Sequence, residues 1–278
     1  MLTNLSGILK EAYENKYAVG SFNGYNYETF KGIIDAGVET NTPIIVAFGA
    51  KYLKNMSLDT AYAIVRSLAE DIPIPVCLHL DHCSDLDIIY RAIKAGFGSV
   101  MYDGSALPFE ENLKNTKLVC EIAHACNVSV EAELGSLAAG ERSHEGKETD
   151  VEAYTDPDAA KEFVEETKVD ALAVSIGTVH GFYRGTPNIR IDLLKSINEK
   201  LSIPLVLHGG SGTPEEDILN CIANGIAKIN VNTEISAYTV EKSTELLSKE
   251  QPHLSVLAIS QTEYIKEIVK KYIAFFRR

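Results

Sequence analysis

The sequence contains no tryptophan, only five cysteines and no long apolar run. The cysteines are odd in number and form no Cys-x-x-Cys pair, and the N-terminal segment lacks the basic start and apolar core of a signal peptide. No apolar run approaches the roughly 18 residues that a membrane-spanning helix requires. We therefore expect free thiols, a cytoplasmic location and no membrane partner.

Basic charge is also scarce. The chain has 26 Lys and Arg against 39 Asp and Glu, a net charge of −13. Such a chain repels nucleic acid and anionic membranes unless a basic stripe is concentrated somewhere, and none is visible. We expect no nucleic-acid partner. Any phosphate ligand must be small and held locally, by backbone N–H groups and one or two cations.

What the sequence does contain is a repeated pattern of short apolar runs, each followed by an amphipathic segment of helical length. The eight runs cover residues 17–22, 43–48, 74–80, 98–103, 127–133, 169–177, 203–209 and 226–232. Most are continuously hydrophobic, which is typical of parallel strands covered on both faces. Eight strand–helix units in succession predict an α/β protein with a (β/α)₈ TIM barrel, forming a single domain over residues 1–278.

A doubly wound open sheet is the competing fold, but its Gly-x-Gly-x-x-Gly fingerprint is absent. Helix starts are predicted at four N-cap candidates, which are Ser57, Ser84, Asp156 and Thr213. The polar segment 134–157 follows the fifth strand. It is either a solvated surface loop or a mobile lid over the catalytic rim.

Active groups of such barrels lie at the carboxyl ends of the strands. Histidines occupy three of these ends, at His82, His180 and His208. Neutral imidazoles suit Zn²⁺, and a catalytic zinc takes three protein ligands and an open position. The three histidines therefore predict a metal site, with His79 as a supporting or core group and Cys83 as a packed thiol.

Several other strand-end groups are candidates for acid–base work. Asp81 adjoins a metal ligand and could accept or return a proton. Glu131 and Glu133 point the same way, although Glu131 could equally be the buried partner of Lys228. Lys228 could itself form a Schiff base with a carbonyl substrate. The three histidines argue against that mechanism, because Schiff-base chemistry needs no metal.

Two glycine- and asparagine-containing turns follow the last two strands, HGGSG (208–212) and NVNT (230–233). They occupy the region where barrels commonly bind phosphate. Arg184 could supply a cation and Asn23 a further polar contact at the rim. These residues predict a small phosphorylated carbonyl compound as the substrate.

Six segments, LHLDHCSD, GSVMYDGSALPFEEN, VSVEAELG, SIGTVHGFYRGTPN, PLVLHGGSG and AKINVNTE, resemble in order and spacing the class II zinc-dependent ketose-bisphosphate aldolases. The resemblance runs from about residue 4 to 240. It implies a (β/α)₈ barrel that reversibly cleaves fructose or tagatose 1,6-bisphosphate to dihydroxyacetone phosphate and glyceraldehyde 3-phosphate. It also implies zinc on His82, His180 and His208, and Asp81 as the proton donor and acceptor at the fourth carbon.

The resemblance extends to the remaining site residues. It assigns Glu133 to a second metal position and Glu141 to the lid glutamate that moves a proton on the dihydroxyacetone phosphate carbon. It implies a monovalent cation, Na⁺ or K⁺, and a homodimer or homotetramer. The dihydroxyacetone phosphate moiety is expected on Gly181, Gly209, Gly210, Ser211, Asn230, Val231, Asn232 and Thr233.

Three departures from the family pattern concern the rim after the second strand, the lid and the far end of the substrate. Gly49 stands where relatives often have Ser or Thr, and Ala138-Ala139 replaces a Gly-Gly pair before Glu141. Thr262 falls about where the fructose-bisphosphate members carry a phosphate-binding arginine. The aldehyde half is therefore open, and another ketose 1-phosphate is an alternative substrate. A non-catalytic sugar-phosphate-binding barrel is a remote alternative, as is a metallohydrolase, although the first strand lacks His-x-His.

Overall fold

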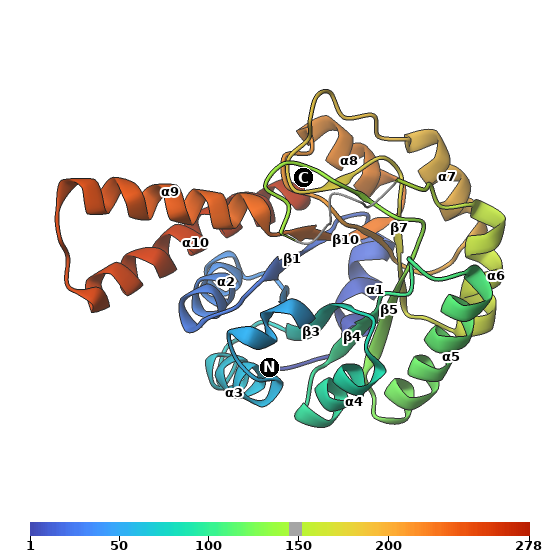
Figure 1. The fold of residues 1–278 in the computed structure, drawn as a ribbon, viewed down its shortest axis with the longest axis horizontal. Helices are drawn as coiled ribbons and strands as arrows, with labels where there is room; N and C mark the ends of the chain where they lie inside the picture. The colour runs from blue at the N-terminus through green and yellow to red at the C-terminus, as the bar shows by residue number, and fades with distance from the viewer. Residues whose placement is uncertain (145–151) are drawn as a thin grey trace.

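The structure is a computed structural model that describes residues 1–144 and 152–278. Eight parallel strands close into a barrel in the order β1-β10-β9-β7-β5-β4-β3-β2 (Figure 1). The strands are β1 Val19–Asn23, β2 Ile44–Gly49, β3 Val76–Cys83, β4 Ser99–Tyr102, β5 Ser129–Leu134, β7 Ala171–Val174, β9 Leu205–Leu207 and β10 Ile226–Val231. Pairing of β1 with β10 closes the sheet. The predicted barrel is confirmed and the open sheet is excluded.

Helices lie outside the strands, as Figure 1 shows. They are α2 Tyr27–Thr40, α3 Leu58–Leu68, α4 Leu86–Ala95, α5 Phe109–Ala125, α6 Pro157–Thr167, α7 Ile191–Lys200 and α8 Glu215–Ala223, with a short 3₁₀ helix η1 at Ala50–Lys54. Ser57 and Asp156 cap α3 and α6 through their side chains, as predicted. The predictions for Ser84 and Thr213 are wrong by one residue.

The physical reasons for those two errors are visible in the caps. At α4 the longer carboxylate of Asp85 accepts hydrogen bonds from the backbone N–H groups of Asp87 and Ile88, which a serine one residue earlier does not reach. At α8 Pro214 occupies the N-cap position and makes no side-chain capping bond. Thr213 instead donates its hydroxyl to the Gly209 carbonyl, which ties the loop after β9 together.

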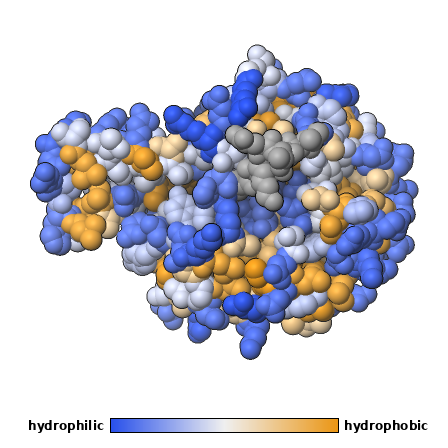
Figure 2. Space-filling view, viewed as in Figure 1, coloured by the Kyte–Doolittle hydropathy of each residue, from blue (hydrophilic) through white to orange (hydrophobic). Residues whose placement is uncertain are grey.

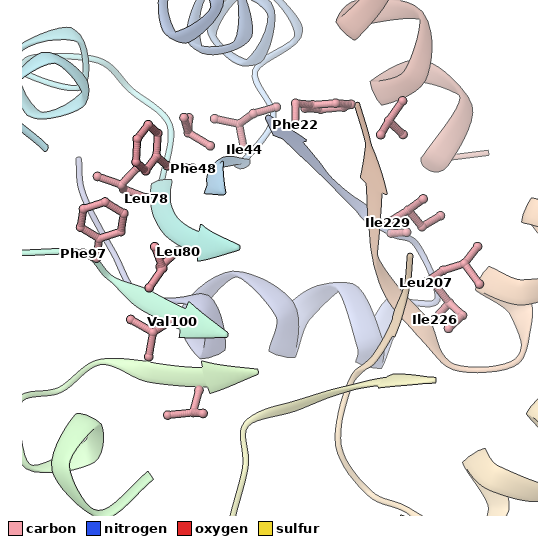
Figure 3. Packing of buried hydrophobic residues seen from close by; sticks show 14 of the residues in the cluster. Phe22, Ile44, Phe48, Leu78, Leu80, Phe97, Val100, Leu207, Ile226 and Ile229 are labelled. Carbon is pink, nitrogen blue, oxygen red and sulfur yellow. The ribbon is translucent and has the colours of Figure 1, made fainter. Parts of the chain in front are cut away.

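The main hydrophobic core lies between the strands and the surrounding helices. Alternate strand residues point outward into it, among them Phe48, Leu78, Leu80 and Val100, and Phe97 joins them from the loop before β4 (Figure 3). All five are buried. Because the outward positions are apolar, the inward positions are left to carry the chemistry.

A second, smaller core fills the bottom of the barrel. Helix α1, Leu5–Asn15, places Leu5 and Leu9 against the inward residues Val19, Ile45 and Val206. Above this apolar floor the inward side chains become polar and remain buried, with His79, Glu131 and Lys228 at mid-height. The barrel therefore has an apolar base, a charged middle and a polar mouth.

Two features of the fold are not predicted by the sequence pattern. Helices α9, Thr233–Lys249, and α10, Leu254–Phe276, form a hairpin that projects well beyond the barrel (Figure 1). The returning α10 packs on α2, where a side-chain carbon at Gly32 would lie 2.8 Å from Ile265. Strands β6 Ala138–Ala139 and β8 Val179–His180 form a separate two-stranded parallel sheet. Within residues 1–144 and 152–278, no helix is both long and apolar enough to cross a membrane.

Candidate active site at the barrel mouth

Three histidines from distant parts of the chain meet at the barrel mouth. His82 is the second-last residue of β3, His180 lies in β8 and His208 follows β9. The ring centroids are 5.0 Å apart for His82 and His180, 4.6 Å for His82 and His208, and 6.0 Å for His180 and His208. One ring nitrogen from each lies within 4.8 Å of the other two. This is the arrangement that a three-histidine metal site requires.

The backbone at His82 allows two consecutive residues to face the mouth. His82 has a φ of 43°, and the pairing of β3 with β4 shifts register between Leu80 and Cys83. In a regular strand neighbouring side chains point to opposite faces. The left-handed residue turns the His82 ring toward the same side as Asp81, and such strain is typical of functional sites.

Two carboxylates determine which ring nitrogens face the centre of the cluster. His82 Nδ1 lies 2.9 Å from Asp103 Oδ2, and His208 Nε2 lies 2.9 Å from Glu131 Oε1. An ionised carboxylate only accepts, so these nitrogens carry the protons. His82 Nε2 and His208 Nδ1, and likewise His180 Nε2, are buried without a hydrogen-bond partner. The position of Asp103 at a strand end is visible in the sequence, but its role as the partner of His82 is not.

The charges around the three rings fit a divalent cation. Burial lowers the pKa values of His180 and His208, which keeps both rings neutral and able to bind a metal. Burial also disfavours charge on His82, but the Asp81 and Asp103 carboxylates outweigh it and raise the pKa. Burial and the charge of Asp103 raise the pKa of Glu133. A dication bound among these groups would offset the cost of burying their carboxylates.

Glu133 lies between two candidate metal positions. Its Oε2 is 3.6 Å from His208 Nδ1 and 4.0 Å from His82 Nδ1. His82, Asp103 and Glu133 form a second group whose ligand atoms all lie within 4.8 Å of one another. The residues at the mouth therefore fit one metal on the three histidines and offer carboxylates for a neighbouring position.

Asp81 is held at the mouth by two amides. Its Oδ2 accepts a hydrogen bond from Asn23 Nδ2 at 2.9 Å, and its Oδ1 accepts one from Asn230 Nδ2 at 3.1 Å. Burial alone would raise the pKa of Asp81, but the positive charges of His82 and Lys228 hold it far below its ordinary value. The side chain is therefore an ionised carboxylate that can accept a proton.

The turns after β9 and β10 form a cradle of backbone groups. Gly209 has a φ of 73°, and a side-chain carbon there would lie 2.2 Å from the Val179 carbonyl oxygen, so only glycine fits. Ser211 Oγ accepts from the Glu234 N–H at 3.2 Å. Helix α9 begins at Thr233 with no capping bond from the Asn232 side chain. A helix N-terminus beside a glycine-rich turn favours an anion such as phosphate.

The other residues of these turns support the cradle through their own contacts. Gly210 donates its N–H to the Asn230 carbonyl at 3.0 Å. Val231 is buried in the outer core. Asn232 Nδ2 donates to the Tyr52 hydroxyl at 3.0 Å, which links the cradle to η1.

The segment that follows β8 lies beside the start of the predicted lid. Gly181 has a φ of 99° and packs on the Glu141 backbone, which pairs with Phe182 in an antiparallel bridge. The Glu141 side chain is exposed. Arg184 is also exposed and lines a separate pocket of about 330 Å³ with Ala138, and no histidine is among its lining residues. Residues 145–151 of the predicted lid fall outside the described residues.

Three further side chains that the sequence analysis singles out have clear places in the fold. Lys228 has 0% exposure and its Nζ lies 2.8 Å from Glu131 Oε2, so it is the buried ion partner of Glu131. Cys83 is buried and its thiol donates to the Asp85 carbonyl. Thr262 is buried where α10 packs on α2, so that position does not face the site.

A cationic pocket lies beside the cradle and has no clear signature in the sequence. It encloses about 1150 Å³ between η1 and α9, and Asn232 and Thr233 are among its lining residues. Three cations, Lys51, Lys54 and Arg142, line it together with one described carboxylate, Glu241. The lysine at the second position after β2, Lys51, resembles an ordinary solvated residue in the sequence.

Comparison with known proteins agrees with this geometry. The family model described as "Fructose-bisphosphate aldolase class-II" matches residues 3–278. The chain belongs to the class II fructose-bisphosphate aldolase family, whose members are metal-dependent carbon–carbon lyases.

Among its relatives, a sulfofructosephosphate aldolase of Alkalicoccus urumqiensis is 38% identical over 97% of this chain and 94% of that protein. A fructose-bisphosphate aldolase of Staphylococcus aureus (strain Mu50) is 42% identical over 90% of this chain and 87% of that protein. The crystal structure of the YdjI aldolase from Escherichia coli K12 has a TM-score of 0.88 and 36% identity, and the match covers 99% of this chain and 97% of that chain.

Proposed function

We propose that this protein is a class II aldolase that reversibly cleaves a ketose 1,6-bisphosphate to dihydroxyacetone phosphate and glyceraldehyde 3-phosphate. Fructose 1,6-bisphosphate is the first choice of substrate. The observation that carries the proposal is the meeting of His82, His180 and His208 beside Asp81, whose carboxylate two asparagine amides hold at the mouth. The family match supports the same reaction class.

The metal is proposed to be Zn²⁺, one per chain, held by His82, His180 and His208, with Glu133 at a neighbouring position. A zinc ion bound there would act as a Lewis acid toward the negative charge that develops on the substrate carbonyl oxygen. A monovalent cation, Na⁺ or K⁺, is proposed near the phosphate cradle.

Asp81 and Glu141 are proposed to move the protons. Asp81 takes the proton from the hydroxyl on the fourth carbon, whose oxygen then forms the aldehyde as the bond between the third and fourth carbons breaks. The electron pair of that bond stays on the dihydroxyacetone phosphate half as an enediolate. Glu141 then delivers a proton to the third carbon and completes that product. In the reverse direction both transfers run backward.

The dihydroxyacetone phosphate end is proposed to lie on the cradle. The residues assigned to it are Gly181, Gly209, Gly210, Ser211, Asn230, Val231, Asn232 and Thr233. Asn23 is assigned to the reacting end because its Oδ1 is buried without a partner beside Asp81. The role of Arg184 in substrate binding stays a prediction, because Arg184 lines a pocket separate from the histidine cluster.

The aldehyde half is proposed to carry a second anionic group. The cationic pocket of Lys51, Lys54 and Arg142 supports this, since it adjoins the cradle and offers charges that Thr262 does not. Tagatose 1,6-bisphosphate or another ketose 1-phosphate is the alternative substrate, and a relative named for sulfofructosephosphate makes a sulfonate a specific candidate.

We further propose that the chain works in a reducing cytoplasm as a homodimer or homotetramer. All five cysteines are free thiols. The projecting hairpin exposes five large apolar side chains, those of Val240, Leu247, Leu254, Val256 and Ile259. Figure 2 shows an orange area on this hairpin. Exposed apolar patches of this kind are typical of protein interfaces.

A coupled assay of triose phosphate release tests the proposal. It is run side by side on fructose 1,6-bisphosphate, tagatose 1,6-bisphosphate, fructose 1-phosphate and 6-deoxy-6-sulfofructose 1-phosphate. The proposal predicts turnover of at least one, with the substrates that carry a second anion favoured. Tight binding without turnover across the panel would indicate a non-catalytic sugar-phosphate-binding barrel, and phosphate release without aldol products would indicate a hydrolase.

A further inference from the structure

A buried lysine connects the metal ligands to the proposed proton acceptor. Lys228 lies on β10 below the histidine cluster and is fully buried. Its Nζ lies 2.8 Å from Glu131 Oε2, 3.1 Å from Glu131 Oε1 and 2.7 Å from Asn230 Oδ1. The proposed reaction gives this ammonium group no step.

One branch of this network reaches His208. Glu131 is paired with Lys228 and is therefore held as a carboxylate, which accepts hydrogen bonds and donates none. Its Oε1 lies 2.9 Å from His208 Nε2, so that nitrogen must be the protonated one. The lone pair of the ring is then on Nδ1, the buried atom without a partner that faces the other two histidines.

The other branch reaches Asp81. A lysine ammonium can only donate, so the atom of Asn230 that faces it must be the carbonyl oxygen. This fixes the orientation of the amide and directs Asn230 Nδ2 at Asp81 Oδ1, 3.1 Å away. With the amide reversed, an oxygen would face the carboxylate and repel it.

We propose that Lys228 is a positioning residue that sets the tautomer of His208 through Glu131 and, at the same time, the orientation of Asp81 through Asn230. The simpler alternative is a structural ion pair that only neutralises Glu131. The two differ once the whole pair is removed. A structural pair can be replaced by neutral side chains at little cost, whereas loss of a positioning group must disturb both branches.

The test compares the double variant Lys228→Met/Glu131→Gln with the control Ile229→Val, a buried position on the same strand that packs in the outer core. The double variant removes both charges of the ion pair and so leaves no unpaired Glu131 carboxylate, which favours folding over Lys228→Met alone. We expect its Zn²⁺ affinity, measured by chelator competition without substrate, to fall about 10- to 100-fold. At saturating metal we expect kcat to fall about tenfold or more, with KM changed less than about threefold.

Nitrogen-15 NMR of the imidazole groups provides a readout that needs no substrate or metal. The proposal predicts that His208 of the wild-type protein carries its proton on Nε2 and that the double variant shows a mixture of tautomers. A wild-type His208 protonated on Nδ1 would overturn the proposal even if the double variant does not fold. So would a folded double variant with Zn²⁺ affinity and kcat within about threefold of Ile229→Val.

The role given to Asp81 rests on the proposed function. The tautomer of His208 and the Zn²⁺ affinity are measured without substrate, so they can be tested whether or not the protein is an aldolase. The protein could lack aldolase activity and still show the Nε2 tautomer of His208 and the loss of Zn²⁺ affinity in the double variant. That outcome would contradict the proposed function but support the link from Lys228 to His208. An active aldolase that shows neither would contradict only the role of Lys228.

Discussion

At the scale of single residues, the function depends on a few atoms whose hydrogen bonds leave them one orientation. Asp103 accepts a hydrogen bond from His82, and Glu131 accepts one from His208. The second nitrogen of each ring is then available for a metal. Asn23 and Asn230 each hold one oxygen of Asp81. Such supporting contacts matter because a catalytic group misplaced by a fraction of an ångström loses much of its effect.

Replacing Asp81 tests its role as proton acceptor. We expect Asp81→Ala to keep its fold and its metal, because Asp81 is not one of the three histidine ligands, and to lose about 10²- to 10⁴-fold in kcat for cleavage. The control is Asp87→Ala, which removes a carboxylate that is 80% exposed on α4. Circular dichroism, metal analysis and the triose phosphate assay provide the readouts. Turnover of Asp81→Ala equal to that of the control would remove Asp81 from the mechanism.

At the scale of elements, the strands were predictable and the small irregular features were not. Parallel strands covered on both faces are continuously apolar, so all eight runs were visible in the sequence. The left-handed turn at His82 has no such signature, because the sequence does not show which of two adjacent strand-end residues rotates inward. Strands β6 and β8 have two residues each, too few for any periodicity to appear.

The site was predictable in its residues more than in its contacts. Strand-end histidines and glycine-rich turns can be recognised from sequence because the barrel dictates where they converge. Whether Glu131 pairs with Lys228 could not be decided, since a buried ion partner and a catalytic carboxylate occupy the same inward position. The hairpin of α9 and α10 was missed because its amphipathic pattern does not reveal that it leaves the barrel.

The contact between α2 and α10 provides a prediction at this scale. Glu39 on α2 lies 2.8 Å from Lys266 Nζ and 2.7 Å from Lys270 Nζ on α10. Hydrogen bonds from these two lysines lower the pKa of Glu39 from 4.5 to about 2. The folded-state pKa is depressed, so the stabilisation is present above about pH 4.5 and is lost as the pH falls toward 2.

We expect Glu39→Gln to lower the free energy of unfolding by less than about 1 kcal/mol at pH 7, because the pair is exposed to solvent. The difference from wild type should shrink as the pH is lowered from 4.5 to 3. Urea unfolding at pH 7, 4.5 and 3 measures it. Glu263→Gln is the control, because Glu263 pairs with Lys266 within α10 and does not connect the helices. A difference that stayed constant down to pH 3 would contradict the assignment.

At the scale of the whole molecule, the hairpin and the barrel have different surfaces. The barrel buries most of its apolar residues between strands and helices, although a few, such as Leu118 at 42%, are exposed. The hairpin exposes its apolar residues more strongly, with Leu254 at 74% and Ile259 at 64%. Figure 2 shows an orange area on the hairpin. Residues of this kind are rarely left in water as a group. A second copy of the chain that covered the hairpin would remove these apolar side chains from water.

Sedimentation velocity tests the association. We expect the wild-type protein to sediment as a dimer or tetramer and Ile259→Asp to shift toward monomer, because a charge in an apolar interface is costly to desolvate. Leu118→Asp on α5 is the matched control, since Leu118 is also an exposed apolar residue, at 42%. A monomeric wild type, or equal dissociation of both variants, would contradict an interface at the hairpin.

The central claim is that the three histidines hold a dication on which carbon–carbon cleavage depends. The most direct measurement is the rate of triose phosphate release from fructose 1,6-bisphosphate before chelation, after chelation and after Zn²⁺ is returned, with metal content measured at each stage. The account predicts about one zinc per chain at the start, no cleavage after chelation and recovery with Zn²⁺. Undiminished cleavage by the metal-free protein, or substrate trapped on Lys228 by borohydride, would contradict it.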